Sequence, residues 1–172
     1  EHTDKLVVVH AEQEDLINYF SAKHKSSKMH HLMRDNLAAV LSTAESVLTT
    51  QYHKKRLHLA HLSTKEEIAF LRKFKTPAIS CEACPHHLFK NSSFFIAHGN
   101  YGKMNPPLRS EEDRTELWKA LKEGLIDIIA TDHAPHTHTE KELSFEEAPC
   151  GVPGVQTMMP LLLNEVNQGT LS

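Results

Sequence analysis

Short apolar runs alternate with longer segments of helical periodicity along the chain. The apolar runs are rich in branched side chains, and polar residues follow each of them, at 5–10, 56–61, 77–82 and 126–131. Strands that are buried in a parallel sheet show continuous runs of this kind rather than strict alternation. The pattern therefore predicts four buried strands.

The segments between these runs carry apolar residues at three- and four-residue spacing, as one face of a helix does. Helices are predicted over residues 12–23, 35–50, 63–74, 110–124 and 155–166. Ser63 and Glu66 are predicted to form a capping box at the start of the third helix, and Gly124 to cap the end of the fourth. Pro160 predicts a kink or a later start in the last helix.

A strand followed by a helix, repeated four times, predicts parallel strands joined by right-handed crossovers. An open doubly wound sheet and a (β/α)8 barrel both fit this α/β order. A complete barrel needs roughly 250 residues, whereas this chain has 172. Residues 1–172 are therefore predicted to be one unit holding about half of a barrel. A half barrel exposes two strand edges and an apolar face, which favours pairing with another chain, for example as a homodimer.

Composition narrows the class of protein. Hydrophobic residues make up 40% and charged residues 24%, as in a globular protein, and no apolar run approaches the roughly 18 residues of a transmembrane helix. A formal charge of −3 without a basic segment argues against binding to nucleic acid.

An odd number of cysteines and the lack of signal-peptide features favour the reducing cytoplasm. Cys81 and Cys84 form a C-x-x-C pair, but no second pair completes a zinc site, so we interpret both as structural.

Residues with metal-ligand chemistry follow three of the predicted strands, namely His10, His61 and Asp132. Active sites of parallel α/β folds form at the carboxyl edge of the sheet, where such residues would meet. Each residue alone is more simply explained as structural, since Asp132 could cap a turn. Together, two imidazoles and a carboxylate predict a catalytic divalent-metal site, which makes hydroxide available near neutral pH. A carboxylate beside it could transfer the proton.

Six segments together resemble the ordered motifs of dihydroorotases, within the cyclic amidohydrolase superfamily: VHAE, HLAHLST, CEACPHHL, KMNPPLRS, ATDHAPH and APCGVPG. The resemblance covers residues 6–172. Related cyclic amidohydrolases share single pieces such as VHAE, whereas KMNPPLRS followed by ATDHAPH separates dihydroorotases from allantoinases and dihydropyrimidinases. Cys84 departs from the family pattern, which more usually has threonine there.

The resemblance implies the carboxyl-terminal half of a binuclear zinc barrel of the metal-dependent hydrolase type. Such enzymes interconvert N-carbamoyl-L-aspartate and L-dihydroorotate in pyrimidine biosynthesis. It implies that His10 and His61 ligate the second, more exposed zinc, and that Asp132 ligates the first and is the catalytic acid and base. Hydroxide would attack the ring amide carbonyl, and Asp132 would protonate the departing nitrogen. Substrate-binding positions are implied at Asn105, His136 and the backbone of Cys150 and Gly151.

The family's other zinc ligands, a His-x-His pair and a bridging carboxylate, belong to a half that this sequence does not contain. The chain is therefore expected to hold at most a partial zinc site and to be inactive alone. Two alternatives stay open: a non-catalytic scaffold that binds a partner such as aspartate transcarbamoylase, and a related hydrolase, an allantoinase or dihydropyrimidinase. Asp132 and His136 favour an enzyme, because a scaffold has no chemical need for either.

Other polar residues in these motifs receive less specific interpretations. His86 and His87 are predicted to position their loop, and Lys103 to be a solvated surface residue. Arg109 either pairs with a substrate carboxylate or orients its loop. His133 is predicted to brace Asp132 through a hydrogen bond. The remaining histidines of interest are expected to be exposed or structural: His30, His31, His53, His98 and His138. Two long connections, at 87–110 and 132–154, are expected to be functional loops.

Overall fold

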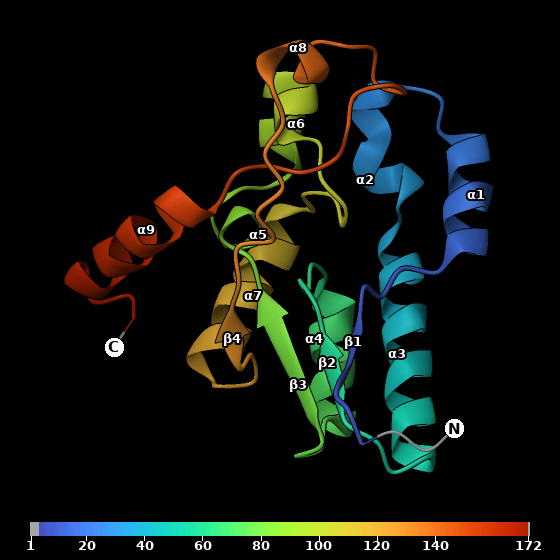
Figure 1. The fold of residues 1–172 in the computed structure, drawn as a ribbon, viewed down its shortest axis with the longest axis vertical. Coiled ribbons are helices and arrows are strands. Elements are labelled where there is room, and N and C mark those ends of the chain that lie inside the picture. Colours follow the sequence, from blue (N-terminus) through green and yellow to red (C-terminus); the bar gives the residue numbers. More distant parts are fainter. Residues whose placement is uncertain (1–3, 172) are drawn as a thin grey trace.

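Residues 4–171, which the computed structural model describes, form a parallel four-stranded sheet with helices on one side of it (Figure 1). The strand order in the sheet, β1-β2-β3-β4, is the order along the chain. Helices separate each strand from the next, so every pairing is a parallel crossover, as predicted. The strands are β1 (Val7–Val9), β2 (Leu57–Leu59), β3 (Ile79–Ala83) and β4 (Ile128–Ile129).

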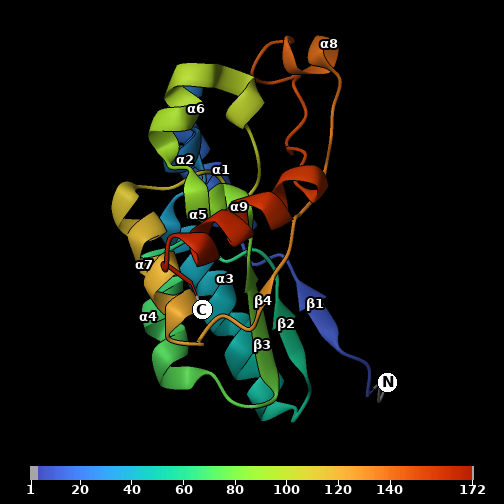
Figure 2. The same ribbon diagram turned by 90° about the vertical axis from the view of Figure 1, so that its left-hand side faces the viewer.

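The five predicted helices are present as α1 (Glu14–Lys23), α3 (Asn36–Tyr52), α4 (Lys65–Phe74), α7 (Glu111–Lys122) and α9 (Val155–Asn167). Helices α3, α4 and α7 stack on the same side of the sheet (Figure 2). Short helices lie in the connections between these elements and beyond the carboxyl ends of the strands: α2 (His30–Met33), α5 (Pro85–Phe89), α6 (Ser92–His98) and α8 (His138–Lys141), with 3₁₀ turns at Ser27–Met29 and Gly99–Gly102.

The core lies between the two central strands and these three helices. Side chains alternate across a strand, so every second residue of β2 and β3 faces the helices. Leu57 and Leu59 of β2 and Cys81 of β3 are buried there with at most 1% exposure, against Ile68 of α4 and Leu117 of α7. Burying a side chain of this size contributes about 1.5–3 kcal/mol each.

The opposite face of the two central strands is polar. His58 Nδ1 lies 2.8 Å from Ser80 Oγ, and His58 Nε2 lies 2.9 Å from Glu82 Oε2. His58 and Ser80 are direct register partners in β2 and β3. The row His58–Ser80–Glu82 therefore satisfies its own hydrogen bonds on the sheet face that the helices leave uncovered.

The prediction of four buried strands is wrong for the two outer strands. Val7 and Val8 of β1 are 44% and 62% exposed, and Ile128 of β4 is 46% exposed. Both strands are edges of the sheet in residues 4–171, so each lacks a neighbour on one side. Helix α9 extends away from the sheet with no buried residue in it (Figure 1). These apolar surfaces agree with a barrel that is only partly enclosed.

Two local predictions need correction. The capping box at the start of α4 joins Thr64 and Glu67, one residue later than predicted. The Glu67 side chain is buried and also accepts a hydrogen bond from Thr43 Oγ1 at 2.9 Å, which favours this register. Helix α9 begins at Val155 with Pro160 inside it, so the predicted later start does not occur. No helix within residues 4–171 is both long and apolar enough to span a membrane.

His30 is structural, one of the two outcomes predicted for it. Its ring is 5% exposed, and its Nε2 atom lies 3.0 Å from the Met104 carbonyl oxygen. It packs against the rings of Phe95 and Phe145. Burial lowers the pKa of His30 to about 4, although the hydrogen bond to Met104 opposes that effect. His53, His98 and His138 are exposed, as predicted.

We expect His30 to make the fold sensitive to acid. Because its pKa is lowered in the folded protein, the unfolded chain takes up the proton first. Stability is therefore present above about pH 6.5 and falls as the pH drops towards 4, by up to about 3 kcal/mol. His30→Gln should flatten this part of the pH dependence in urea unfolding experiments. The exposed His53→Gln is the control, and an unchanged slope in His30→Gln would contradict the assignment.

Candidate metal centre and substrate site

The side chains of His10 and His61 meet at the carboxyl edge of the sheet, just beyond β1 and β2. His10 Nδ1 lies 3.1 Å from His61 Nε2, and the two rings are T-shaped with centroids 4.8 Å apart. Two imidazole nitrogens on one tetrahedral zinc ion are about 3.3 Å apart, given Zn–N bonds of about 2.0 Å. The two nitrogens thus have nearly the separation that a shared divalent cation requires.

His61 and Asp132 share an unusual backbone conformation. Their φ angles are +38° and +44°, in the left-handed region that residues with a Cβ rarely adopt. Strained backbone of this kind persists only where the surrounding structure fixes it, and it is common at functional sites. Each residue follows a strand, so the left-handed turn ends β2 and β4 at the same edge of the sheet.

The buried carboxylate of Glu12 contacts Nε2 of His10, the ring nitrogen that does not face His61. Glu12 Oε2 lies 3.0 Å from His10 Nε2 and 2.7 Å from Arg34 Nη2, and Glu12 Oε1 lies 3.3 Å from Arg109 Nη2. Burial alone would raise the pKa of Glu12, but the bonds to His10 and Arg34 and the charges of the two arginines lower it to about 2. A metal-binding histidine is usually fixed in this way by a carboxylate on its other ring nitrogen. Glu12 was missed as a site residue, although it is the last residue of VHAE.

Glu82 contacts the backbone of His61 rather than its ring. Its Oε1 atom accepts a hydrogen bond from the His61 backbone N–H at 3.3 Å, while its Oε2 atom is bonded to His58. The polar row on the open face of the sheet therefore reaches the turn that carries His61. Glu82 lies in CEACPHHL, so its motif was recognised although its contact was not.

Asp132 lies near His61, but its carboxylate does not lie close enough to both histidines to form a compact set of metal ligands. Burial lowers the pKa of His61 most, positive charge at His10 lowers it further, and the charge of Asp132 opposes both. Within residues 4–171, Asp132 does not complete a compact three-ligand group with the two histidines. Its strand, β4, pairs with β3 through two residues only. His10 and His61 fit a divalent cation as donors, while Asp132 remains a predicted ligand.

Three of the predicted substrate positions, His136, Cys150 and Gly151, lie together in one loop cluster. His136 Nε2 lies 3.0 Å from the Cys150 carbonyl oxygen. Gly151 has a φ of +128°, and a Cβ there would lie 2.6 Å from Ala134 Cβ and 3.2 Å from His136 Nε2, so glycine is required for this close approach. Asn105 Oδ1 is buried without a hydrogen-bond partner among the described residues. An amide oxygen in that position can accept a hydrogen bond from a ligand.

Two lysines tie these loops together, and the prediction that Lys103 is a solvated surface residue is wrong. Lys103 is 7% exposed, and its amine donates to the carbonyl oxygens of Phe145 and Ala148. Lys141 donates to the carbonyl oxygens of Lys103 and Pro149 at 3.2 and 2.9 Å. Both amines therefore donate to backbone carbonyls of the loops and hold these loops against one another.

Arg109 orients its loop, the second of the two roles considered for it. Its guanidinium is 3% exposed and donates to Ser63 Oγ at 3.2 Å and to the Arg34 carbonyl oxygen. Together with its ion pair to Glu12, these bonds link the loop before α7 to the segment that carries His10. A guanidinium enclosed in this way has no need of a ligand carboxylate.

Two further histidines hold loops in place. His87 Nε2 lies 3.0 Å from the Pro106 carbonyl oxygen, so His87 positions its loop as predicted. His133 Nδ1 accepts hydrogen bonds from the backbone N–H groups of Gly154 and Val155 at 3.0 and 3.3 Å. These bonds fix the start of α9. His133 was predicted to brace Asp132, but its ring bonds to this other segment instead.

Comparison with known proteins places this arrangement in context. No model of a protein family matches the chain. A curated protein named dihydroorotase from Halobacterium salinarum is 38% identical over 98% of this chain, and one from Staphylococcus epidermidis is 40% identical over 92% of it. The chain spans only 39% and 38% of the length of these two relatives.

Solved structures agree on the fold. The dihydropyrimidinase from Brevibacillus agri matches 98% of the chain with a TM-score of 0.91 at 25% sequence identity. The match covers 40% of that chain. With four parallel strand–helix units in residues 4–171, the predicted partial (β/α)8 barrel is confirmed.

Proposed function

Because the chain belongs to the dihydroorotase family, we propose that it is the carboxyl-terminal part of a zinc-dependent dihydroorotase. Such an enzyme hydrolyses a cyclic amide and interconverts L-dihydroorotate and N-carbamoyl-L-aspartate in pyrimidine biosynthesis. The approach of His10 Nδ1 to His61 Nε2, at 3.1 Å and at the carboxyl edge of the sheet, carries the proposal. The fixation of His10 by the buried Glu12 carboxylate supports it.

The proposed metal ligands are His10, His61 and Asp132. A bound zinc ion supplies a water of lowered pKa and polarises the amide carbonyl. Asp132 takes the proton of the attacking water and delivers it to the ring nitrogen as the carbon–nitrogen bond breaks. In the reverse direction Asp132 takes a proton from the carbamoyl nitrogen as the ring closes and returns it to the carboxylate oxygen, which departs as water. Glu12 keeps the His10 ring in place throughout.

The proposed substrate contacts are Asn105, His136 and the backbone at Cys150 and Gly151. The unpartnered Asn105 Oδ1 accepts a hydrogen bond from an amide N–H of the substrate. His136 is held against the Cys150 carbonyl, and Gly151 allows the close packing that keeps it there. These groups recognise a small polar ring with amide and carboxylate substituents.

The chain by itself supplies a partial zinc site, and we propose that it is inactive alone. The remaining ligands come from the part of the relatives' length that the chain does not span. The exposed valines of β1 and the uncovered α9 support association of the isolated chain as a homodimer. Light scattering tests this association, and a well-behaved monomer would contradict it.

The buried thiols of Cys81 and Cys84 suit a reducing compartment, the cytoplasm.

Zinc should bind at His10 and His61, and the binding should depend on Glu12. In nitrogen-edited NMR spectra of histidine rings, added zinc should move the His10 and His61 signals and leave that of exposed His53 unchanged. Glu12→Gln removes the charge behind His10 and should weaken the zinc affinity by about 10- to 100-fold. Zinc that moves neither ring would contradict the proposed centre.

Activity is tested in a hybrid protein in which this chain replaces the matching part of the Halobacterium relative. The other part of that relative then supplies the missing ligands. We expect the hybrid to open the ring of dihydroorotate and the isolated chain to leave it unchanged. A folded, zinc-loaded hybrid without ring-opening activity would favour the scaffold alternative, and one that opens hydantoin or allantoin instead would favour a related hydrolase.

A further inference from the structure

Three side chains with metal-ligand chemistry converge where β3 leads into α5. Cys84 Sγ and one ring nitrogen each of His86 and His87 all lie within 4.8 Å of one another. Zinc with sulfur and nitrogen ligands holds its donor atoms about 3.3–3.6 Å apart, given bonds of about 2.3 and 2.0 Å. Small side-chain rotations therefore suffice to close the group. We propose that Cys84, His86 and His87 bind Zn²⁺ or another thiophilic divalent cation.

The start of α5 explains why the three side chains meet. Cys84 is the N-cap residue, with Pro85 in the first turn, and His86 and His87 follow as the second and third helical residues. A side chain at the N-cap folds over the backbone of the second and third helical residues. Cys84 makes no capping hydrogen bond, so its sulfur remains available to a metal above that turn.

Each of the two imidazoles has one ring nitrogen without a hydrogen-bond partner among the described residues. His87 Nε2 is bonded to the Pro106 carbonyl oxygen, so this nitrogen donates and the lone pair lies on Nδ1. His87 Nδ1 and His86 Nε2 are both buried without a hydrogen-bond partner in the described chain. Buried nitrogens are rarely left unpaired, and metal-binding histidines commonly bond a carbonyl through the other nitrogen. One ring nitrogen of each histidine also lies within 4.8 Å of the other and of Cys84 Sγ, which points to a ligand that all three side chains can bind.

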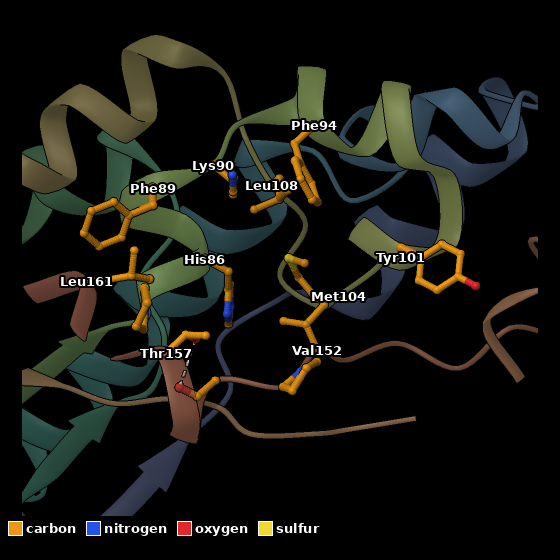
Figure 3. A pocket seen from close by; sticks show the side chains of 13 residues that line it. His86, Phe89, Lys90, Phe94, Tyr101, Met104, Leu108, Val152, Thr157 and Leu161 are labelled. Carbon is orange, nitrogen blue, oxygen red and sulfur yellow. Dashed lines mark hydrogen bonds between the residues drawn. The ribbon is translucent and has the colours of Figure 1, made fainter. Parts of the chain in front are cut away.

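The surroundings favour a cation and give it a route. Burial raises the pKa of the Cys84 thiol most, and the nearby negative charges of Asp132 and Glu82, which also attract a cation, raise it further. Binding therefore forms a sulfur–metal bond and releases the thiol proton to solvent. A pocket of about 340 Å³ begins at His86, whose ring points into it between Leu161 and Met104 (Figure 3). The metal enters past His86, and a water from this pocket completes its ligands.

The site differs in chemistry from the centre at His10 and His61. That centre holds nitrogen and oxygen donors only, whereas this one has a thiolate. Cys81 takes no part, because its Sγ atom donates to the Leu125 carbonyl oxygen at 3.4 Å and packs in the core. A probe that reports sulfur–metal bonds therefore distinguishes the two sites.

Cobalt is such a probe, because Co²⁺ bound to a thiolate absorbs in the near ultraviolet and Co²⁺ bound to histidine and carboxylate does not. We expect Co²⁺ titration of the full chain to produce this band, and added Zn²⁺ to remove it. Cys84→Ala should abolish the band. Cys150→Ala, which removes a half-buried cysteine of another loop, should retain it.

His86→Gln provides a test that leaves the buried thiol intact, should Cys84→Ala fail to fold by circular dichroism. Losing this nitrogen should weaken the Co²⁺ binding that the band reports by about 10-fold or more. The proposal is overturned if the chain shows no band, if folded Cys84→Ala keeps it, if Cys150→Ala loses it, or if His86→Gln binds Co²⁺ as tightly as the unchanged chain.

Discussion

Asp132→Asn should lower the rate of dihydroorotate ring opening by about 10²- to 10⁴-fold in the hybrid protein, since a positioned acid and base contributes that much. The substitution keeps the size of the side chain and removes its ability to carry a proton. Asp132 has a φ of +44°, and asparagine tolerates that conformation as well as aspartate does. The loss is therefore expected in the chemical step rather than in the fold. Loss of dihydroorotate is followed by chromatography.

A matched control makes the same chemical change elsewhere. Asp35 is the N-cap residue of α3 and accepts a hydrogen bond from the Leu37 backbone N–H at 2.9 Å. Asparagine caps a helix as well as aspartate, so Asp35→Asn should leave the rate unchanged. If Asp132→Asn retained activity within about threefold of the parent, a factor worth less than 1 kcal/mol, the acid and base role would be wrong.

Arg109→Met should destabilise the fold by about 3–5 kcal/mol, which is the usual effect of removing one partner of a buried ion pair. Glu12 would keep its charge with its side chain fully buried, and would lose one of its two arginines. The Ser63 hydroxyl and the Arg34 carbonyl would lose their donor. Urea unfolding measures the change, and the zinc affinity should fall with it because Glu12 holds His10.

Arg72→Met is the control for Arg109. Arg72 also pairs with two carboxylates, Glu116 and Glu123, but these pairs lie at the surface. Exposed pairs contribute little, so the change in stability should stay within about 1 kcal/mol. An equal loss in both variants would mean that the buried network has no special role in the fold.

The central part of the fold could be predicted because its signals are local. β2 and β3 lie within two of the predicted runs and place an apolar residue at every second position, and the stripes of α3, α4 and α7 repeat with helical spacing. The prediction was wrong for burial of β1 and β4 because a strand's neighbours, rather than its own residues, decide its exposure. The cap of α4 shifted by one residue because Thr43, from another helix, bonds to Glu67.

In the candidate site, too, features with a local signal could be predicted and contacts set by tertiary structure could not. His10 and His61 could be predicted from their positions after apolar strands, and the structure brings their rings together. The burial of Lys103 could not, because its carbonyl partners come from residues 145 and 148, more than 40 positions along the chain. Glu12 contacts arginines at positions 34 and 109. Such partners depend on tertiary structure and leave no periodic pattern.

The row of His58, Ser80 and Glu82 on the open face of the sheet limits what can be placed opposite it. These side chains already bond to one another, so a second half of the barrel need bring no hydrogen-bond partner for His58. An unpaired aspartate placed against Glu82 would be desolvated beside a like charge. Anyone engineering a replacement half should therefore line it with small, neutral side chains at this level and rely on shape for the fit.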